Sequence, residues 1–354
     1  MMNFVKKPVT LYTADDVDAP NFNTVNGEFG TPLQLFEMFK QILVDGYGTG
    51  ANFKEPMGWT LVEYKATIPD ASIGGGSYVF MAVFRNASGT TYLELSKGTS
   101  VTDDFYRTNS KIYFSAHAWW NSYTDKAAPM DGDSTMYLGH TSASSQASKF
   151  VFVGNEDAFV FFMTAPQRWG SYYNCSSSPS LHGYVGDYNY ATENDPVKSL
   201  FLYSNTTGSS SYNWNSSWVY TMASVGYYQP AGLEFVGLDG TGASRMNIIP
   251  SPISGFIGVE NGDSAVLKEI GATCNLHIRL GTISYNMTAA ANAVPNTPYY
   301  RGSLRGLEIS SQPMCADHDA FPIPNIQTFD GVKYCMWPSI NTGISLCWIN
   351  CEEW

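Results

Sequence analysis

The sequence predicts a mainly β protein, arranged like a β-sandwich with long loops and one short N-terminal amphipathic helix. Its composition carries this prediction. Aromatic residues make up 15% of the 354 residues and charged residues only 14%, so the polar surface is built from Ser, Thr, Asn and Gly. These residues disfavour helices, because Ser, Thr and Asn hydrogen-bond nearby backbone and Gly has the most entropy to lose. Tyr, Trp, Phe, Val and Thr fit strands.

Residues 1–30 are expected to form an extended N-terminal arm. They contain Pro8 and Pro20 together with acidic residues and Asn, and they show little apolar periodicity. Such a segment is expected to be poorly ordered on its own. We therefore expect the arm to reach an adjacent subunit or another protein, and the chain to fold without residues 1–25.

One helix is predicted, over residues 32–44. Thr31 is a suitable N-cap, Pro32 occupies the first helical position, and Gln34 is placed for a capping box. Leu, Phe and Ile recur along one face, and Gly46 provides the C-terminal signal. Because so short a helix is marginal alone, its apolar face is expected to dock on the first sheet.

Most of the following chain alternates between strand-forming segments and turns. Each predicted strand is rich in β-branched or aromatic residues, and Gly, Pro, Asn or Asp clusters bound most of them. The predicted strands are residues 59–67, 77–85, 91–96, 111–119, 136–139, 150–153, 157–164, 218–224, 232–238, 254–259, 277–285, 334–337 and 344–349. Residues 286–298 suit either a short helix or an irregular crossover.

The apolar run over residues 158–163 predicts a central strand that is buried on both faces. Residues 155–157 and residues 86–89 have the composition of hairpin connections. These segments place antiparallel neighbours next to each other in the predicted sheets.

The predicted domain organisation follows the distribution of these segments. After the arm, residues 31–203 form a β-rich domain that contains the helix. Residues 204–217 are rich in Ser and Asn and predict a loop or a boundary. Residues 218–354 form a second β-rich region, which can pack into the same domain.

Charge and motifs exclude several classes of function. A net charge of −12 with scattered Lys and Arg argues against a nucleic-acid partner. No apolar run approaches about 18 residues, so membrane insertion is not expected. The first ten residues do not resemble a signal peptide, so we expect no export by the general secretory route. Without a nucleophile elbow, P-loop, dinucleotide fingerprint or H-E-x-x-H motif, we expect a non-enzymatic protein without cofactor.

The cysteines leave three interpretations open. Cys175 and Cys274 stand alone, whereas the other four gather near the C-terminal end: Cys315, Cys335, Cys347 and Cys351. A zinc site, a disulfide and buried free thiols all suit this group. Buried thiols are favoured, because free Cys is among the most buried residue types. His117 alternates with apolar neighbours, which favours a hydrogen-bonded sheet histidine over a catalytic base.

Aromatic residues near polar loops are candidates for stacking against sugar rings. These candidate surface-binding residues are Trp119, Trp120, Trp169, Tyr172, Trp214, Trp218 and Tyr227. The alternative is that half of them fill the core and the rest form subunit contacts, where such residues are enriched. The size of a β-protein core favours this alternative.

A series of short motifs also resembles a known family. It includes Leu-Val-Asp-Gly-Tyr-Gly at 43–48, Gly-Trp-Thr at 58–60, Tyr-Val-Gly-Asp at 184–187, Tyr-Arg-Gly-Ser-Leu-Arg-Gly-Leu at 300–307 and the terminal Trp354. The series is similar to virion structural proteins of tailed bacteriophages and prophages. The resemblance implies a component of the tail, baseplate or neck that contacts other virion proteins and copies of itself. It also implies assembly in the host cytoplasm, release by lysis and location in the virion.

Two other functions remain open at this point. A receptor- or carbohydrate-binding virion protein would use the aromatic loops to contact a host-surface glycan. A polysaccharide hydrolase would need two carboxyl groups that converge from distant strands, and this is the least favoured interpretation.

Overall fold

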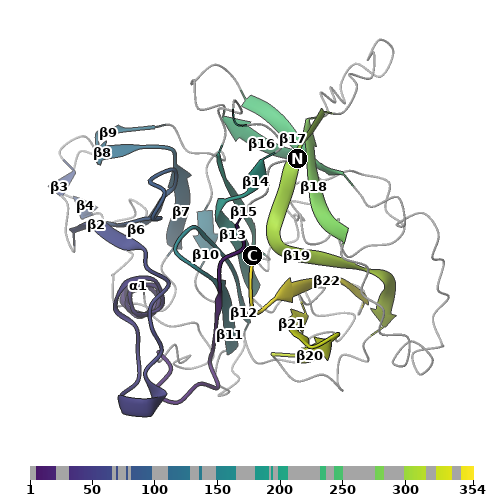
Figure 1. Cartoon of the computed structure of the whole chain (residues 1–354). Coiled ribbons are helices and arrows are strands. Elements are labelled where there is room, and N and C mark those ends of the chain that lie inside the picture. Colours follow the sequence, from purple (N-terminus) through teal and green to yellow (C-terminus); the bar gives the residue numbers. More distant parts are fainter. Residues whose placement is uncertain are drawn as a thin grey trace, which may run out of the picture.

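The computed structural model describes residues 5–20, 32–65, 69–70, 77–78, 81–97, 111–127, 135–137, 149–164, 180–190, 193, 198–205, 232–236, 243–249, 276–282, 299–315, 324–336 and 344–354. These residues form a mainly β structure of antiparallel sheets with one short α-helix near the N-terminus, which confirms the predicted fold class. The helix lies beside two sheets, and a third sheet lies on the opposite side of the central one (Figure 1).

A five-stranded antiparallel sheet occupies the centre of the molecule. Its order is β1 (Thr10–Thr13), β11 (Lys149–Gly154), β12 (Ala158–Thr164), β13 (Ser180–Asp187) and β15 (Ser199–Asn205). Strand β12 is its middle strand, and residues 158–163 are buried without interruption. The apolar run therefore forms a strand covered on both faces, as the sequence predicts, and residues 155–157 connect it to β11 as a hairpin.

A second five-stranded sheet faces the helix. Its order is β10 (Thr135–Tyr137), β7 (Lys111–His117), β6 (Tyr92–Lys97), β5 (Met81–Arg85) and β2 (Thr60–Lys65). Residues 86–91 connect β5 to β6, so the predicted connection at residues 86–89 lies within an observed hairpin turn. The rings of Phe114 in this sheet and Phe161 in the central sheet stack with centroids 6.3 Å apart, so the two sheets share one core, as in a sandwich.

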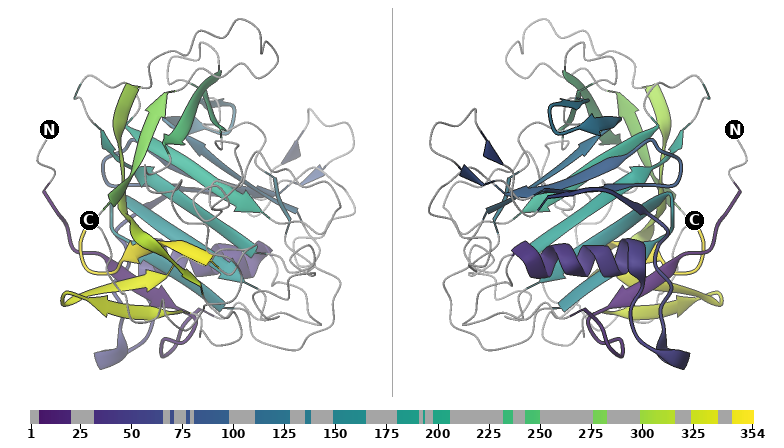
Figure 2. Two further views of the ribbon diagram at one scale, coloured as in Figure 1. Left: turned by 90° about the vertical axis from the view of Figure 1, so that its right-hand side faces the viewer. Right: turned by 90° about the vertical axis from the view of Figure 1, so that its left-hand side faces the viewer.

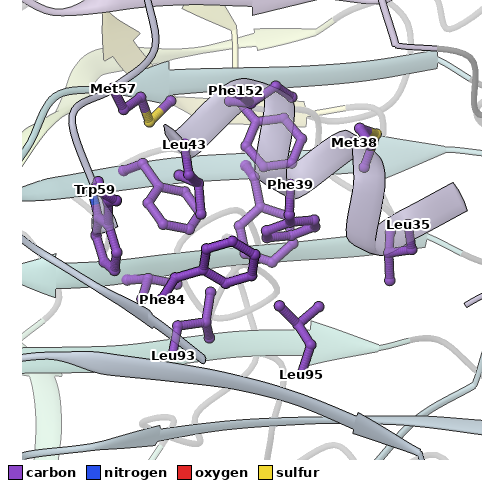
Figure 3. Close-up of a cluster of buried hydrophobic side chains, with 14 of the residues drawn as sticks. Leu35, Met38, Phe39, Leu43, Met57, Trp59, Phe84, Leu93, Leu95 and Phe152 are labelled. Carbon is purple, nitrogen blue, oxygen red and sulfur yellow. The ribbon is translucent and has the colours of Figure 1, made fainter. Parts of the chain in front are cut away.

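Helix α1 (Pro32–Lys40) continues into the π-helical turn η1 (Gln41–Asp45) and ends where the Gly46 N–H donates to Gln41 O. The predicted helix is thus confirmed, while Thr31 lies outside the described residues. The Phe39 ring meets Phe152 and Phe114 edge-on at 5.1 and 5.5 Å. The helix therefore packs across both sheets (Figure 2), with its apolar side chains directed into their common core (Figure 3).

The third sheet contains most of the described C-terminal part. Its order is β16 (Gly232–Val236), β17 (Ala243–Ile249), β18 (Leu276–Thr282), β19 (Tyr299–Cys315), β22 (Ile344–Asn350), β21 (Val332–Met336) and β20 (Ile326–Phe329), and β14 (Asn189–Tyr190) pairs with β19. Two small pairs, β3 (Pro69–Asp70) with β4 (Ser77–Tyr78) and β8 (Trp120–Ser122) with β9 (Asp125–Lys126), and the 3-10 turn η2 (Gly50–Asn52) complete the elements.

The structure corrects the expectation of a free N-terminal arm for residues 5–20. Strand β1 pairs with β11 in the central sheet, and Tyr12 is completely buried. Pro8 forms a β-bridge with Glu353, so the beginning of the chain pairs with its end. Backbone pairing and one large buried ring hold this segment, and neither produces an apolar period that a sequence pattern reveals.

The first two residues of the predicted loop or boundary over residues 204–217 belong to a strand. Ser204 and Asn205 belong to β15, and residues 206–217 lie outside the described part of the chain. Strand β14, from the first predicted domain, joins the sheet of the second through β19. Predicted strands 218–224 and 254–259 and segment 286–298 lie outside the described residues.

Candidate functional site

A buried carboxylate in the β11–β12 turn joins three parts of the chain. Asp157 Oδ2 lies 2.8 Å from Lys7 Nζ and 2.9 Å from Arg305 Nη1 on β19. Lys7 also contacts Glu156. Burial disfavours the charged form of Lys7, but hydrogen bonds to Asp157 and Glu156 outweigh this and raise the pKa of Lys7. The charges thus tie the N-terminal segment and the third sheet to the central sheet.

A second buried carboxyl group, Asp187 at the end of β13, collects donors from the β5–β6 turn. Its Oδ1 accepts hydrogen bonds from Asn86 Nδ2 at 2.9 Å, Ser88 Oγ at 3.1 Å and Thr90 Oγ1. Burial raises the pKa of Asp187, although the Thr90 hydrogen bond opposes the shift. Asn86 Nδ2 also donates to the backbone oxygen of Asp157 at 3.1 Å, which links the two carboxyl-bearing turns. We call Lys7, Asn86, Asp157, Asp187 and Arg305 the polar junction.

Tyr184 closes the polar junction from β13. Its hydroxyl donates to Asp187 O and accepts from Arg305 N at 3.4 Å. The side chain is fully buried, and burial raises the pKa of Tyr184. The phenol therefore stays neutral and serves both as donor and as acceptor.

The residue after Arg305 holds the C-terminal end of the described chain. Gly306 has a φ of +67°, and a Cβ there would lie 2.0 Å from Trp354 Nε1. The Trp354 indole donates to Asn350 O at 2.7 Å, while Trp354 N donates to Lys7 O at 2.9 Å. Only glycine accommodates both this backbone conformation and the indole. Gly306 therefore lets Trp354, which is bonded to Lys7, pack directly against β19.

The polar junction is suited to joining strands. Asp157 and Asp187 are each 7% exposed, and both bond to side chains of their own chain. An acid–base pair of a polysaccharide hydrolase must instead reach the glycosidic bond. The geometry therefore offers structural cross-links rather than an accessible acid at this position.

A second polar cluster lies on the face of the β2–β5–β6–β7 sheet that points away from α1. Glu94 Oε2 lies 2.9 Å from His117 Nε2 and 2.5 Å from Lys126 Nζ, and His117 Nδ1 lies 2.8 Å from Ala127 O. Burial favours the neutral form of Glu94, but the His117 hydrogen bond and the Lys126 charge outweigh it and lower the pKa of Glu94. His117 is completely buried, as expected for a hydrogen-bonded sheet histidine.

The two adjacent tryptophans predicted as surface aromatics have different environments. Trp120 is buried: its Nε1 donates to Glu63 Oε2 at 2.8 Å, and Lys126 Nζ lies 4.4 Å from its ring centroid. Trp120 is therefore a packing residue, which corrects its assignment as a sugar platform. Trp119 is 43% exposed and keeps an accessible ring. The other candidates lie outside the described residues: Trp169, Tyr172, Trp214, Trp218 and Tyr227.

The cysteines are described in part. Cys335 and Cys351 are buried free thiols, which confirms the favoured interpretation for these two. Burial raises the pKa of Cys335 and raises that of Cys351 to about 12. The described residues contain no group of His, Cys, Asp and Glu that could hold a metal ion, and none of their helices is long and apolar enough to cross a membrane.

Comparison with known proteins gives no relative. No family model matches the chain, and neither a curated protein nor a solved structure matches it significantly. The function of the chain is therefore inferred from its own residues.

Sequence reasoning missed the polar junction. Lys7 beside Lys6 and Asp157 beside Glu156 have the pattern of solvated charges, and the pairing of Asp157 with Arg305 across 148 positions has no local signal. The available signal was the motif at 300–307, which contains Arg305 and Gly306.

Proposed function

We propose that this chain is a non-enzymatic structural component of a tailed-phage virion, in the tail, baseplate or neck, that contacts copies of itself and other virion proteins. One observation carries the proposal. Gly306 belongs to one of the two most specific motifs of the virion-protein resemblance, and this glycine and the adjacent Arg305 fasten Trp354 and the Asp157 turn to β19. The motif thus has a mechanical role in this fold.

The disposition of charged groups supports the same proposal. The two carboxyl groups of the polar junction and Glu94 are buried and bonded within the chain. A subunit that bears load benefits from cross-links between segments distant in sequence, because local opening then requires several buried contacts to break together. A chain with 14% charged residues also exposes few charges that would need desolvation at subunit contacts.

Mass spectrometry of purified particles tests the proposal. Particles from the phage or induced prophage that encodes this chain should contain it at a stoichiometry above one copy. A matched sample of infected cells before assembly controls for carry-over. Particles that are complete and infectious but lack the chain would rule the proposal out.

The exposed ring of Trp119 supports a second candidate function, glycan binding at the host surface. Trp119 directly precedes β8. In the β8–β9 hairpin, Asn121 Nδ2 donates to Asp125 Oδ2 at 3.0 Å, so a neutral and an acidic polar side chain follow Trp119 closely in the sequence. The Trp119→Ala variant should lose adsorption to host cells if this function holds. Unchanged adsorption with unchanged thermal stability would exclude Trp119 from such a site.

A further inference from the structure

Strand β20 forms one end of the third sheet, and the described residues provide no partner for its outer edge. Ile326, Gln327 and Thr328 are all exposed. The strand turns into β21 through Asp330 and Gly331, which have φ angles of +50° and +84°. Positive φ at both positions is the signature of a type I′ hairpin, whose twist keeps the two strands closely paired.

The register determines which backbone groups of β20 face outward. Met336 N donates to Asn325 O at 2.9 Å, and Ile326 pairs with Cys335 in the next position. Hydrogen-bonded and non-hydrogen-bonded pairs alternate along an antiparallel ladder. Since Asn325 belongs to a bonded pair, Ile326 does not, and the backbone N–H and C=O of Gln327 bond to β21. The N–H and C=O groups of Ile326 and Thr328 consequently point away from the sheet.

A comparison with β2, the end strand of the second sheet, shows what is unusual about β20. Strand β2 has a bulge between Leu61 and Glu63 and contains charged residues, both of which hinder pairing with another strand. The sequence of β20, Ile-Gln-Thr-Phe, has no charge and no proline, and its ladder to β21 is regular. The edge of β20 therefore lacks the features that protect β2.

We propose that β20 pairs antiparallel with β20 of a second copy of this chain across a two-fold axis. The inference rests on the proposed function for its choice of a second copy as the partner. Side chains on directly opposed residues must share a face of the joined sheet, and only outward-facing backbone groups can bond. Ile326 opposite the partner's Thr328 satisfies both conditions, and Gln327 then lies opposite the partner's Gln327 on the axis.

This register is self-complementary. The Ile326 and Thr328 pairs each exchange two backbone hydrogen bonds across the interface. Gln327 Nε2 donates to Asn325 Oδ1 at 2.7 Å within its own chain, and the amide keeps a second N–H and its oxygen, so the two Gln327 side chains can still bond to each other across the axis. No charged side chain of β20 enters the contact, although the chain carries a net charge of −12. A four-residue strand buries less than a standard interface, so the isolated pair is weak and gains strength from repetition in an assembly.

Substitutions at Gln327 test the two-fold axis directly. Purified Gln327→Lys places like charges opposite each other, and so does Gln327→Glu; each variant alone should remain monomeric. An equimolar mixture places opposite charges together and should restore association, measured by sedimentation velocity over a concentration series. Ala51→Lys, at an exposed position in η2, is the matched control and should associate like the unmodified chain.

A backbone variant covers the case in which charge at Gln327 disturbs the hairpin. Thr328→Pro removes an outward N–H that the hairpin itself does not use, so association should be lost while the circular dichroism spectrum and melting temperature stay close to those of the unmodified chain. Self-association of all variants, or a monomeric unmodified chain at the highest concentration, would overturn the inference. These measurements use purified protein and no particles. If the chain is found in virions but does not pair through β20, this inference fails while the proposed function stands.

Discussion

The Trp354 indole lies against Gly306, where a Cβ would come within 2.0 Å of Nε1. Gly306 belongs to β19, whereas Trp354 is the last of the described residues. Arg305, which precedes Gly306, binds Asp157 in the β11–β12 turn. This contact makes the closure of the chain ends depend on one glycine.

Gly306→Ala should therefore destabilise the protein more than an ordinary glycine replacement. Gly89→Ala is the matched control, because Gly89 has a similar φ of +72° and a Cβ at that position would have no neighbouring atom within 4 Å. The control should cost about 1–2 kcal/mol for the left-handed conformation. Gly306→Ala should cost a further ~1–3 kcal/mol, because the indole must move. Equal denaturant midpoints for the two variants would contradict the contact.

Arg305→Met should weaken the fold by roughly 3 kcal/mol, the lower end for removing one partner of a buried ion pair, since Lys7 still faces Asp157. Lys6→Met is the control: it breaks the exposed Lys6–Glu353 pair and should change the unfolding free energy very little. Urea unfolding of both variants measures the difference. A small effect at Arg305 would show that Asp157 is solvated.

The buried carboxyl groups of Glu94 and Asp187 should make the stability of the fold depend on pH in opposite directions. The pKa of Glu94 is lowered from 4.5, so its contribution is present above that value and is lost as pH falls through the folded-state pKa. The pKa of Asp187 is raised from 3.8, so its contribution is present below that value and is lost as pH rises through the folded-state pKa. Glu94→Gln should flatten the acid limb of a stability–pH curve, and Asp187→Asn should raise stability at neutral pH. Curves that shift in the same direction would refute this assignment.

Cys335 and Cys351 should resist alkylation in the folded protein. Both are buried, and with a pKa of about 12 the Cys351 thiol has little thiolate at pH 8. Iodoacetamide treatment followed by peptide mass spectrometry should find both residues modified only in denaturant. Rapid modification of Cys351 in the native protein would mean that this part of the third sheet opens.

Deleting residues 1–13 should strongly destabilise or unfold the chain, because it removes β1 and the buried Tyr12. Loss of a large buried aromatic side chain alone costs roughly 3–5 kcal/mol. Deletion of residues 1–5 is the control, since Val5 is 84% exposed and should be dispensable. Thermal unfolding followed by circular dichroism separates the two. A stable protein without residues 1–13 would restore the free-arm expectation.

Local patterns determined the mainly β class, the helix ending near Asp45, the doubly buried strand β12 and the hairpins at residues 86–89 and 155–157. Each depends on periodicity, turn residues or an apolar run within a short window, which is where sequence signals are strongest. Strand β13 was not predicted, because its Gly and polar residues interrupt the run of apolar residues. In the structure it is nevertheless paired on both sides, with β12 and β15.

Only the tertiary structure decided how distant residues pair and which face of each element is covered. Trp119 and Trp120 are adjacent and chemically identical, yet the β8–β9 hairpin buries one and leaves the other accessible. Asp157 occupies a turn that resembles a solvated one, but packing brings Lys7 to it from the N-terminal segment and Arg305 from β19. Burial and long-range ion pairing depend on which segments meet in space, and that information is not contained in any local stretch of sequence.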